Sequence, residues 1–135
     1  MLGYENITLK YKALWLLIGL CMVIFIVYSS LVSDPMNVDM GIEWQDKVLH
    51  TTGYFGLMGW FMQIFHQQKT HYVLAALFIA MGVSLEFLQD FGGVRYFEVS
   101  DMFANTLGVL LAWSLVMTPF PKLLSWFESK LLLNK

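Results

Sequence analysis

Residues 13–32, ALWLLIGLCMVIFIVYSSLV, form an uncharged apolar run that is long enough to cross the hydrocarbon core of a bilayer. A helix of this length spans about 30 Å. Three further apolar segments, 48–65, 72–88 and 102–118, lie near the lower limit of about 17 residues for a spanning helix. The sequence therefore predicts an all-α membrane protein, with one domain over residues 1–135 built as a four-transmembrane-helix bundle.

The composition agrees with a membrane domain. Hydrophobic residues make up 58% of the chain, and charged residues make up 13%, against about 25% in soluble domains. A net charge of −2 without a basic stripe gives no reason to expect nucleic acid as a partner. Cys21 is the single cysteine, which excludes a disulfide within the chain and a thiolate metal cluster. We expect it to be a small buried apolar side chain.

Basic residues predict the orientation of the spans. Six lysines would lie on one side of the membrane: Lys10, Lys12, Lys69, Lys122, Lys130 and Lys135. Only Lys47 and Arg95 would lie on the other side, so both termini are expected in the cytoplasm. Residues 122–135 predict a short amphipathic helix on the inner interface. His66 and His71, which flank the inner loop sequence QQKT, are expected to be solvated.

Polar residues gather at the predicted outer ends of three spans. They are Asp46, Lys47, His50 and Tyr54 at the second span, Glu86 and Gln89 at the third, Arg95 in the following loop, and Asp101 and Asn105 at the fourth. An ionisable residue at the centre of a membrane helix costs roughly 2.5–3.5 kcal/mol, so such residues usually face the bundle interior or a wet cavity. We expect these side chains to form one polar pocket on the extracytoplasmic side.

Two short segments share a pattern. DKVLHTTG, residues 46–53, and DMFANTLG, residues 101–108, both match Asp-x-x-x-(His or Asn)-Thr-x-Gly at an offset of 55 residues. The match indicates either a parallel repeat of two helical hairpins or chance, and a repeat predicts that His50 faces Asn105 across the bundle. Small residues at every fourth position, in the ridges Ala104–Gly108–Ala112 and Ala76–Ala80–Ser84, predict close helix contacts.

The segments DKVLHTTGYFGL and EFLQDFGGVRYFEVSDMFANTLGVLLA resemble the VanZ-like family of small bacterial membrane proteins. The family pattern runs Asp-Lys-x-x-His with a Tyr four residues on, Glu-x-x-Gln, an Arg, an Asp and Asn-Thr-x-Gly. The matching positions are Asp46, Lys47, His50, Tyr54, Glu86, Gln89, Arg95, Asp101, Asn105 and Gly108. A second family glycine is Ala112 here. The family is named for a link to resistance to glycopeptide antibiotics, particularly teicoplanin, so the resemblance implies a multi-pass envelope protein of the bacterial cytoplasmic (inner) membrane without a settled reaction.

The first functional hypothesis is a binding module. Its ligand would be an anionic lipid or a lipid-linked envelope intermediate of the polyprenyl phosphate type. Arg95 and Lys47 would contact the phosphate. Tyr54, Gln89 and Asn105 would supply neutral hydrogen bonds. A membrane protein partner is a further expectation.

The second hypothesis is an intramembrane transferase or hydrolase that acts on such a lipid. His50 would be the general base or nucleophile, with Asp46 or Asp101 as its orienting partner. Glu86 would be the general acid and Arg95 an electrostatic clamp. No cofactor is expected, because no compact ligand motif supports the alternative of a divalent metal on His50, Glu86 and Asp101. The third hypothesis is a structural or accessory subunit, in which the polar residues join helices by hydrogen bonds.

Overall fold

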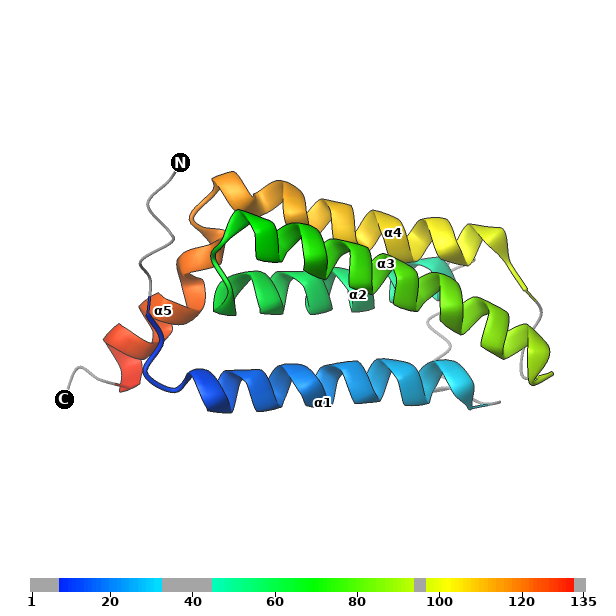
Figure 1. Cartoon of the computed structure of the whole chain (residues 1–135), viewed down its shortest axis with the longest axis horizontal. Helices are drawn as coiled ribbons and strands as arrows, with labels where there is room; N and C mark the ends of the chain where they lie inside the picture. The colour runs from blue at the N-terminus through cyan, green and yellow to red at the C-terminus, as the bar shows by residue number, and fades with distance from the viewer. Residues whose placement is uncertain (1–7, 33–44, 94–96, 133–135) are drawn as a thin grey trace.

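The computed structural model describes residues 8–32, 45–93 and 97–132. In these ranges the chain forms four long helices, α1 (Lys12–Leu31), α2 (Gln45–Ile64), α3 (Gln68–Phe91) and α4 (Val99–Trp113), and no strand. Helices α1 and α3 run in one direction, and α2 and α4 run in the opposite direction (Figure 1). The predicted all-α class is confirmed for the described part of the chain.

Three segments of the described chain are long and apolar enough to cross a membrane: Lys12–Leu31, Gln68–Phe91 and Val99–Met117. Helix α2 is not among them, although it has the same 20 residues as α1. It is the inner helix of the bundle, where Leu57, Met58 and Met62 are fully buried. A helix covered by its neighbours meets little lipid and therefore tolerates a more polar sequence. The four-span count and the orientation remain predictions.

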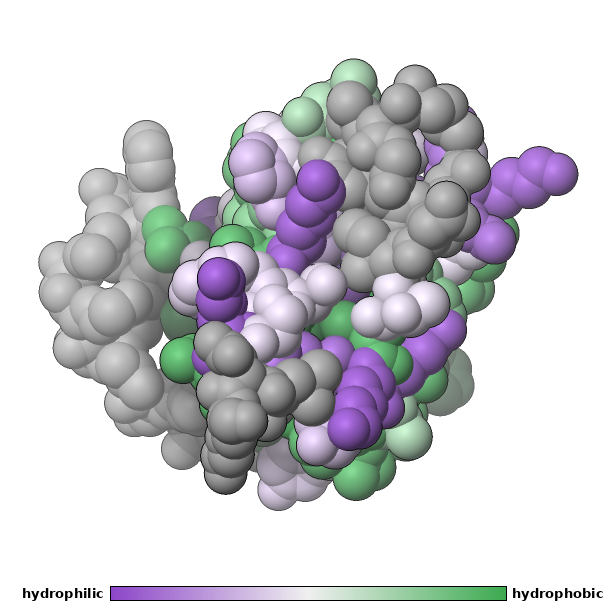
Figure 2. Space-filling model, turned by 90° about the vertical axis from the view of Figure 1, so that its left-hand side faces the viewer, coloured by the Kyte–Doolittle hydropathy of each residue, from purple (hydrophilic) through white to green (hydrophobic). Residues whose placement is uncertain are grey.

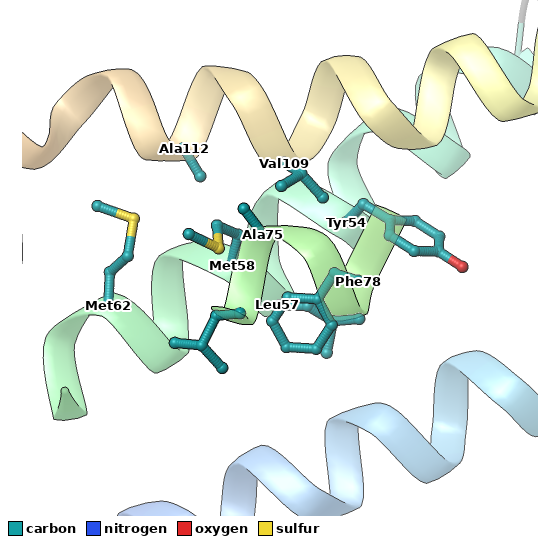
Figure 3. Close-up of a cluster of buried hydrophobic side chains, with 9 residues drawn as sticks. Tyr54, Leu57, Met58, Met62, Ala75, Phe78, Val109 and Ala112 are labelled. Carbon is teal, nitrogen blue, oxygen red and sulfur yellow. The ribbon is translucent and has the colours of Figure 1, made fainter. Parts of the chain in front are cut away.

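The apolar core lies between α2, α3 and α4 (Figure 3). Its buried side chains are Tyr54, Leu57, Met58 and Met62 of α2, Leu74, Ala75 and Phe78 of α3, and Val109 and Ala112 of α4. Within each helix the successive members are one, three or four positions apart, which places them on one face. Because the core continues along most of α2, the three helices hold a fixed register at the polar end described below.

The prediction of a close helix contact is confirmed for one small-residue ridge and wrong for the other. Ala104, Gly108 and Ala112 are buried, as predicted. A Cβ atom added to Gly108 would lie 2.3 Å from the Thr51 carbonyl oxygen, which shows how closely α4 approaches α2. The ridge Ala76–Ala80–Ser84 of α3 is exposed, so the prediction that it makes a helix contact was wrong within this chain. Helix α3 instead buries the face that carries Leu74, Phe78 and Leu85.

Helix α1 lies at the edge of the bundle (Figure 1). Only Trp15 and Gly19 of its residues are buried. Cys21 is exposed, so the expectation that it is a buried side chain was wrong. The reason is that α1 packs through one narrow stripe and leaves the rest of its apolar surface outward, as lipid contact requires.

The C-terminal segment forms short helical turns at the end of the bundle that carries the start of α1. They are η2 (Ser114–Met117), η3 (Phe120–Lys122), α5 (Leu123–Phe127) and η4 (Glu128–Leu132). Figure 2 shows this end of the molecule, where hydrophilic side chains are gathered. Exposed Lys69, Lys122 and Lys130 belong to it. The segment is more than an interfacial helix, because Pro121, Leu124 and Glu128 are buried against the bundle.

The expectation that His66 and His71 are solvated was wrong. His71 is 3% exposed, and its Nε2–H donates to the Phe65 carbonyl oxygen at 2.6 Å. His66 is partly buried, and its Nε2–H donates to the Pro121 carbonyl oxygen at 3.1 Å. Carbonyl groups beyond a helix end lack helical partners, so both histidines stabilise the connections around the end of α2.

Glu128 joins the C-terminal segment to the start of α1. Its carboxylate accepts hydrogen bonds from the backbone N–H groups of Lys10 (2.8 Å) and Tyr11 (2.9 Å) and from Nε1 of Trp15 (2.6 Å). Helix α1 has no side-chain cap at its own N-cap residue. Glu128 therefore acts as its N-terminal cap from a distant part of the chain.

We expect Glu128→Ala to loosen the start of α1. Losing this buried acceptor should cost about 2 kcal/mol and speed amide hydrogen exchange over residues 10–15, while Ser129→Ala, a change at an exposed neighbour, should leave exchange unchanged. Burial raises the pKa of Glu128, but the three hydrogen bonds outweigh burial and hold the pKa below its usual 4.5. The carboxylate's contribution is therefore present at pH 7 and lost only as the pH falls through that lowered pKa. Equal exchange in both variants would contradict the capping role.

Candidate functional site

Polar side chains from three helices meet at the end of the bundle where α3 ends and α2 and α4 begin. This end lies opposite the one that carries the start of α1 and the turns of α5 (Figure 1). We call the group the polar cluster, and its members are Lys47 and His50 of α2, Glu86 of α3, and Asp101 and Asn105 of α4. Glu86, Asp101 and Asn105 are 1%, 3% and 2% exposed. Side chains that are usually solvated are thus buried inside an otherwise apolar bundle.

His50 is held by Asn105. The His50 Nδ1 atom lies 2.8 Å from Asn105 Oδ1. An amide oxygen can only accept, so Nδ1 carries the hydrogen. The His50 Nε2 atom faces Asp101 Oδ2 at 3.8 Å. The prediction that His50 and Asn105 face each other across the bundle is confirmed, and the bond joins equivalent positions of the two similar segments.

Lys47 is held by two acids. Its Nζ lies 2.6 Å from Glu98 Oε2 and also donates to Asp101 Oδ1. Asp101 therefore uses one carboxylate oxygen for Lys47 and turns the other toward His50. Sequence reasoning did not select Glu98 as a site residue. Its position immediately before α4 was the available signal, because acids are favoured at the positive end of a helix dipole.

Gly82 lets α3 approach the cluster. A Cβ atom added there would lie 3.1 Å from the Asn105 side chain and 3.4 Å from the Tyr54 ring. The Tyr54 hydroxyl points away from the apolar core, toward the end of the bundle where α4 begins (Figure 3). Among the described residues this buried hydroxyl has no hydrogen-bond partner. Sequence reasoning did not select Gly82, although it lies one turn before Glu86 on the same helix.

Gln89 lies between helices. Its Nε2 donates to the Ser30 carbonyl oxygen at 2.6 Å, which ties α3 to the end of α1. Its Oε1 is buried and has no hydrogen-bond partner in the described part of the chain. Gln89 thus has a structural role in addition to its predicted binding role.

Two predicted site residues cannot be placed with the others. Arg95 lies outside the described residues. Asp46 belongs to α2, but its side chain lies outside the described part of the structure. The structure thus brings Lys47, His50, Glu86, Asp101 and Asn105 together, while the binding and catalytic roles assigned to all of these residues stay predictions.

The comparisons with known proteins agree with the resemblance noted in the sequence. A family-wide sequence model, described as VanZ/LLP1, matches residues 13–120. No curated protein matches the chain, and no solved structure matches it. The matched range includes α1 from its second residue, all of α2, α3 and α4, and every residue of the polar cluster. The chain belongs to the VanZ/LLP1 family.

Proposed function

We propose that the chain is a protein of the bacterial inner membrane that binds the headgroup of an anionic or lipid-linked envelope lipid at its polar cluster, on the extracytoplasmic side. The observation that carries the proposal is the burial of Glu86, Asp101 and Asn105 at one end of an apolar bundle, beside the partly buried His50. Burial of charged and amide groups is costly. Joining helices alone does not require acids, a base and an amide at the same level of the bundle.

Apolar side chains around the cluster favour a ligand that comes from the membrane. Val48, Phe87, Phe91 and Phe103 lie within a few positions of cluster residues along α2, α3 and α4, and are 49%, 57%, 93% and 71% exposed. A lipid could lay its hydrocarbon chain against these side chains while its headgroup reaches the polar groups.

The polar groups favour a headgroup that carries both phosphate and hydroxyl groups. Lys47 supplies a cation for a phosphate, and Arg95 is the second cation that the sequence places near it. Glu86 and Asp101 can accept hydrogen bonds from sugar hydroxyls. The unpartnered Tyr54 hydroxyl adds a donor. A glycosylated polyprenyl phosphate has this combination of groups, which suits a role in envelope polysaccharide metabolism or glycopeptide resistance.

The test is native mass spectrometry with lipid identification on the purified protein. We expect the wild type to retain one class of anionic or polyprenyl-linked lipid, and Lys47→Met and Arg95→Ala to reduce that retention at least about tenfold. Lys69→Met, which removes an exposed lysine at the opposite end, is the matched control and should retain the lipid. Retention of the same bulk lipid by all four proteins would refute binding and favour the structural or accessory role.

The orientation of His50 favours a second candidate function. Because Asn105 fixes the hydrogen on Nδ1, the Nε2 atom is the one that could take a proton from a hydroxyl group or a water molecule. A transferase or hydrolase acting on the same lipid would use it as general base, with Asp101 beside it. Chemical change of the retained lipid on incubation, abolished in His50→Gln while capture persists, would distinguish an enzyme from a binding protein.

A further inference from the structure

We propose that His50, Glu86 and Asp101 form a binding site for a divalent transition-metal ion of the Zn²⁺ type. Each residue offers one ligand atom, and these atoms lie within 4.8 Å of one another. The three residues come from three different helices, so no local sequence motif indicates the site. The site is a property of the way in which α2, α3 and α4 pack.

The distances suit a metal ion after small side-chain movements. Ligand atoms about 2.1 Å from a tetrahedral Zn²⁺ lie roughly 3.4 Å from one another. The His50 Nε2 and Asp101 Oδ2 atoms are already 3.8 Å apart. Side-chain rotations that move the Glu86 and Asp101 oxygen atoms by about 1 Å would bring all three ligand atoms to the separations that a tetrahedral ion needs. A site with one imidazole nitrogen and two carboxylate oxygens suits Zn²⁺ and similar ions. Mg²⁺ and Ca²⁺ prefer oxygen ligands alone.

Neighbouring residues already orient two of the ligands as metal sites require. A ligating histidine donates its other N–H to an oxygen, which fixes the tautomer. Here Nδ1–H of His50 donates to Asn105 Oδ1, so the lone pair of Nε2 is directed to the side of Asp101. Lys47 holds Asp101 through Oδ1 and leaves Oδ2 turned toward His50. Asn105 and Lys47 are therefore positioning residues for the ion.

Tyr54 is an independent indication of a ligand at this place. It is 3% exposed, and its hydroxyl has no hydrogen-bond partner among the described residues. Gly82 faces both the Tyr54 ring and the Asn105 side chain. The Tyr54 hydroxyl is directed out of the apolar core (Figure 3). A buried hydroxyl without a partner is costly. A water molecule or ligand oxygen bound to the ion would supply that partner.

The ion would also explain how a carboxylate-rich cluster could take an anionic headgroup. Three protein ligands leave a fourth position open for water or a ligand oxygen. A phosphate oxygen in that position would be drawn to the ion in spite of Glu86 and Asp101. This role of the open position rests on the proposed lipid-binding function, whereas the metal site itself does not.

The experiment is titration of the chelator-treated protein in detergent with Co²⁺, which has visible absorption bands when bound. We expect one Co²⁺ per chain, displaced by Zn²⁺. Each of the near-isosteric changes His50→Gln, Glu86→Gln and Asp101→Asn should weaken binding at least about 100-fold, and Asn105→Ala about 10–100-fold. Glu98→Gln, a similar change at an acid of the same end but outside the ligand set, should change affinity less than about threefold. Circular dichroism checks that every variant is folded.

Two results would overturn the metal site. One is a wild type without stoichiometric binding, and the other is unchanged binding in the three ligand variants. Lipid retention by the same samples separates this proposal from the previous one. Metal binding without a retained lipid supports the ion and refutes the lipid, while retention that persists in chelator without any metal binding does the reverse.

Discussion

Gly108→Ala should disrupt the bundle, although it adds only one methyl group. The new Cβ would lie 2.3 Å from the Thr51 carbonyl oxygen and 2.9 Å from the Phe55 backbone nitrogen. Both atoms belong to the backbone of α2, so no side-chain rotation can relieve the clash. The two helices would have to separate along the contact that also holds Val109 and Ala112. We expect a loss of about 3 kcal/mol or more in the free energy of unfolding.

Gly56→Ala is the matched control, since Gly56 lies on α2 and a Cβ added there would be 3.9 Å from the nearest atom, in Met22. In a helix this change should be neutral or stabilising by about 0.5–1 kcal/mol. Both variants can be compared by unfolding in denaturing detergent, followed by circular dichroism. If Gly108→Ala unfolds at the same detergent fraction as Gly56→Ala, the result would contradict a close backbone contact between α2 and α4 at Gly108.

The two acids that hold Lys47 should differ widely in their effects. Asp101 is 3% exposed, whereas the Glu98 side chain is 50% exposed. Asp101→Ala removes a buried carboxylate that both accepts from Lys47 and faces His50, so it should cost about 3 kcal/mol. Glu98→Ala should cost less than about 1 kcal/mol, because water screens an exposed pair.

Double-mutant cycles with Lys47→Ala isolate the two couplings. We expect about 1.5–3 kcal/mol for Lys47 with Asp101, and less than about 0.5 kcal/mol for Lys47 with Glu98. The cycles should be measured in chelator, so that loss of a metal ion does not add to the result. Equal couplings would mean that the burial of Asp101 does not govern this pair.

Much of the site could be predicted from the sequence because membrane helices impose strong constraints. In a chain with 13% charged residues, acids, bases and amides at span ends are conspicuous, and a spanning helix fixes which end each one occupies. The shared pattern of residues 46–53 and 101–108 added one pairwise contact, between His50 and Asn105, which the structure has. These inferences need only helical periodicity and the hydrophobic effect.

Other inferences failed because they depend on how each helix is rotated about its own axis. The ridge at Ala76–Ala80–Ser84 and the side chain of Cys21 face outward, since lipid is as apolar as a protein core and composition cannot tell one side from the other. His71 was misjudged for a related reason. It lies in the first turn of α3, where its Nε2–H donates to the Phe65 carbonyl oxygen just after α2, and hydropathy does not reveal that contact.

The sequence by itself determined the all-α class, the membrane character, the family and the five residues of the polar cluster. Only the tertiary structure decided that Lys47 is held by Glu98 and Asp101, that Gln89 reaches α1, and that His50, Glu86 and Asp101 meet within 4.8 Å. The physical reason is that hydropathy and periodicity act along one helix at a time. Contacts between helices depend on close backbone approaches, such as those at Gly82 and Gly108, which exist only once the helices are packed.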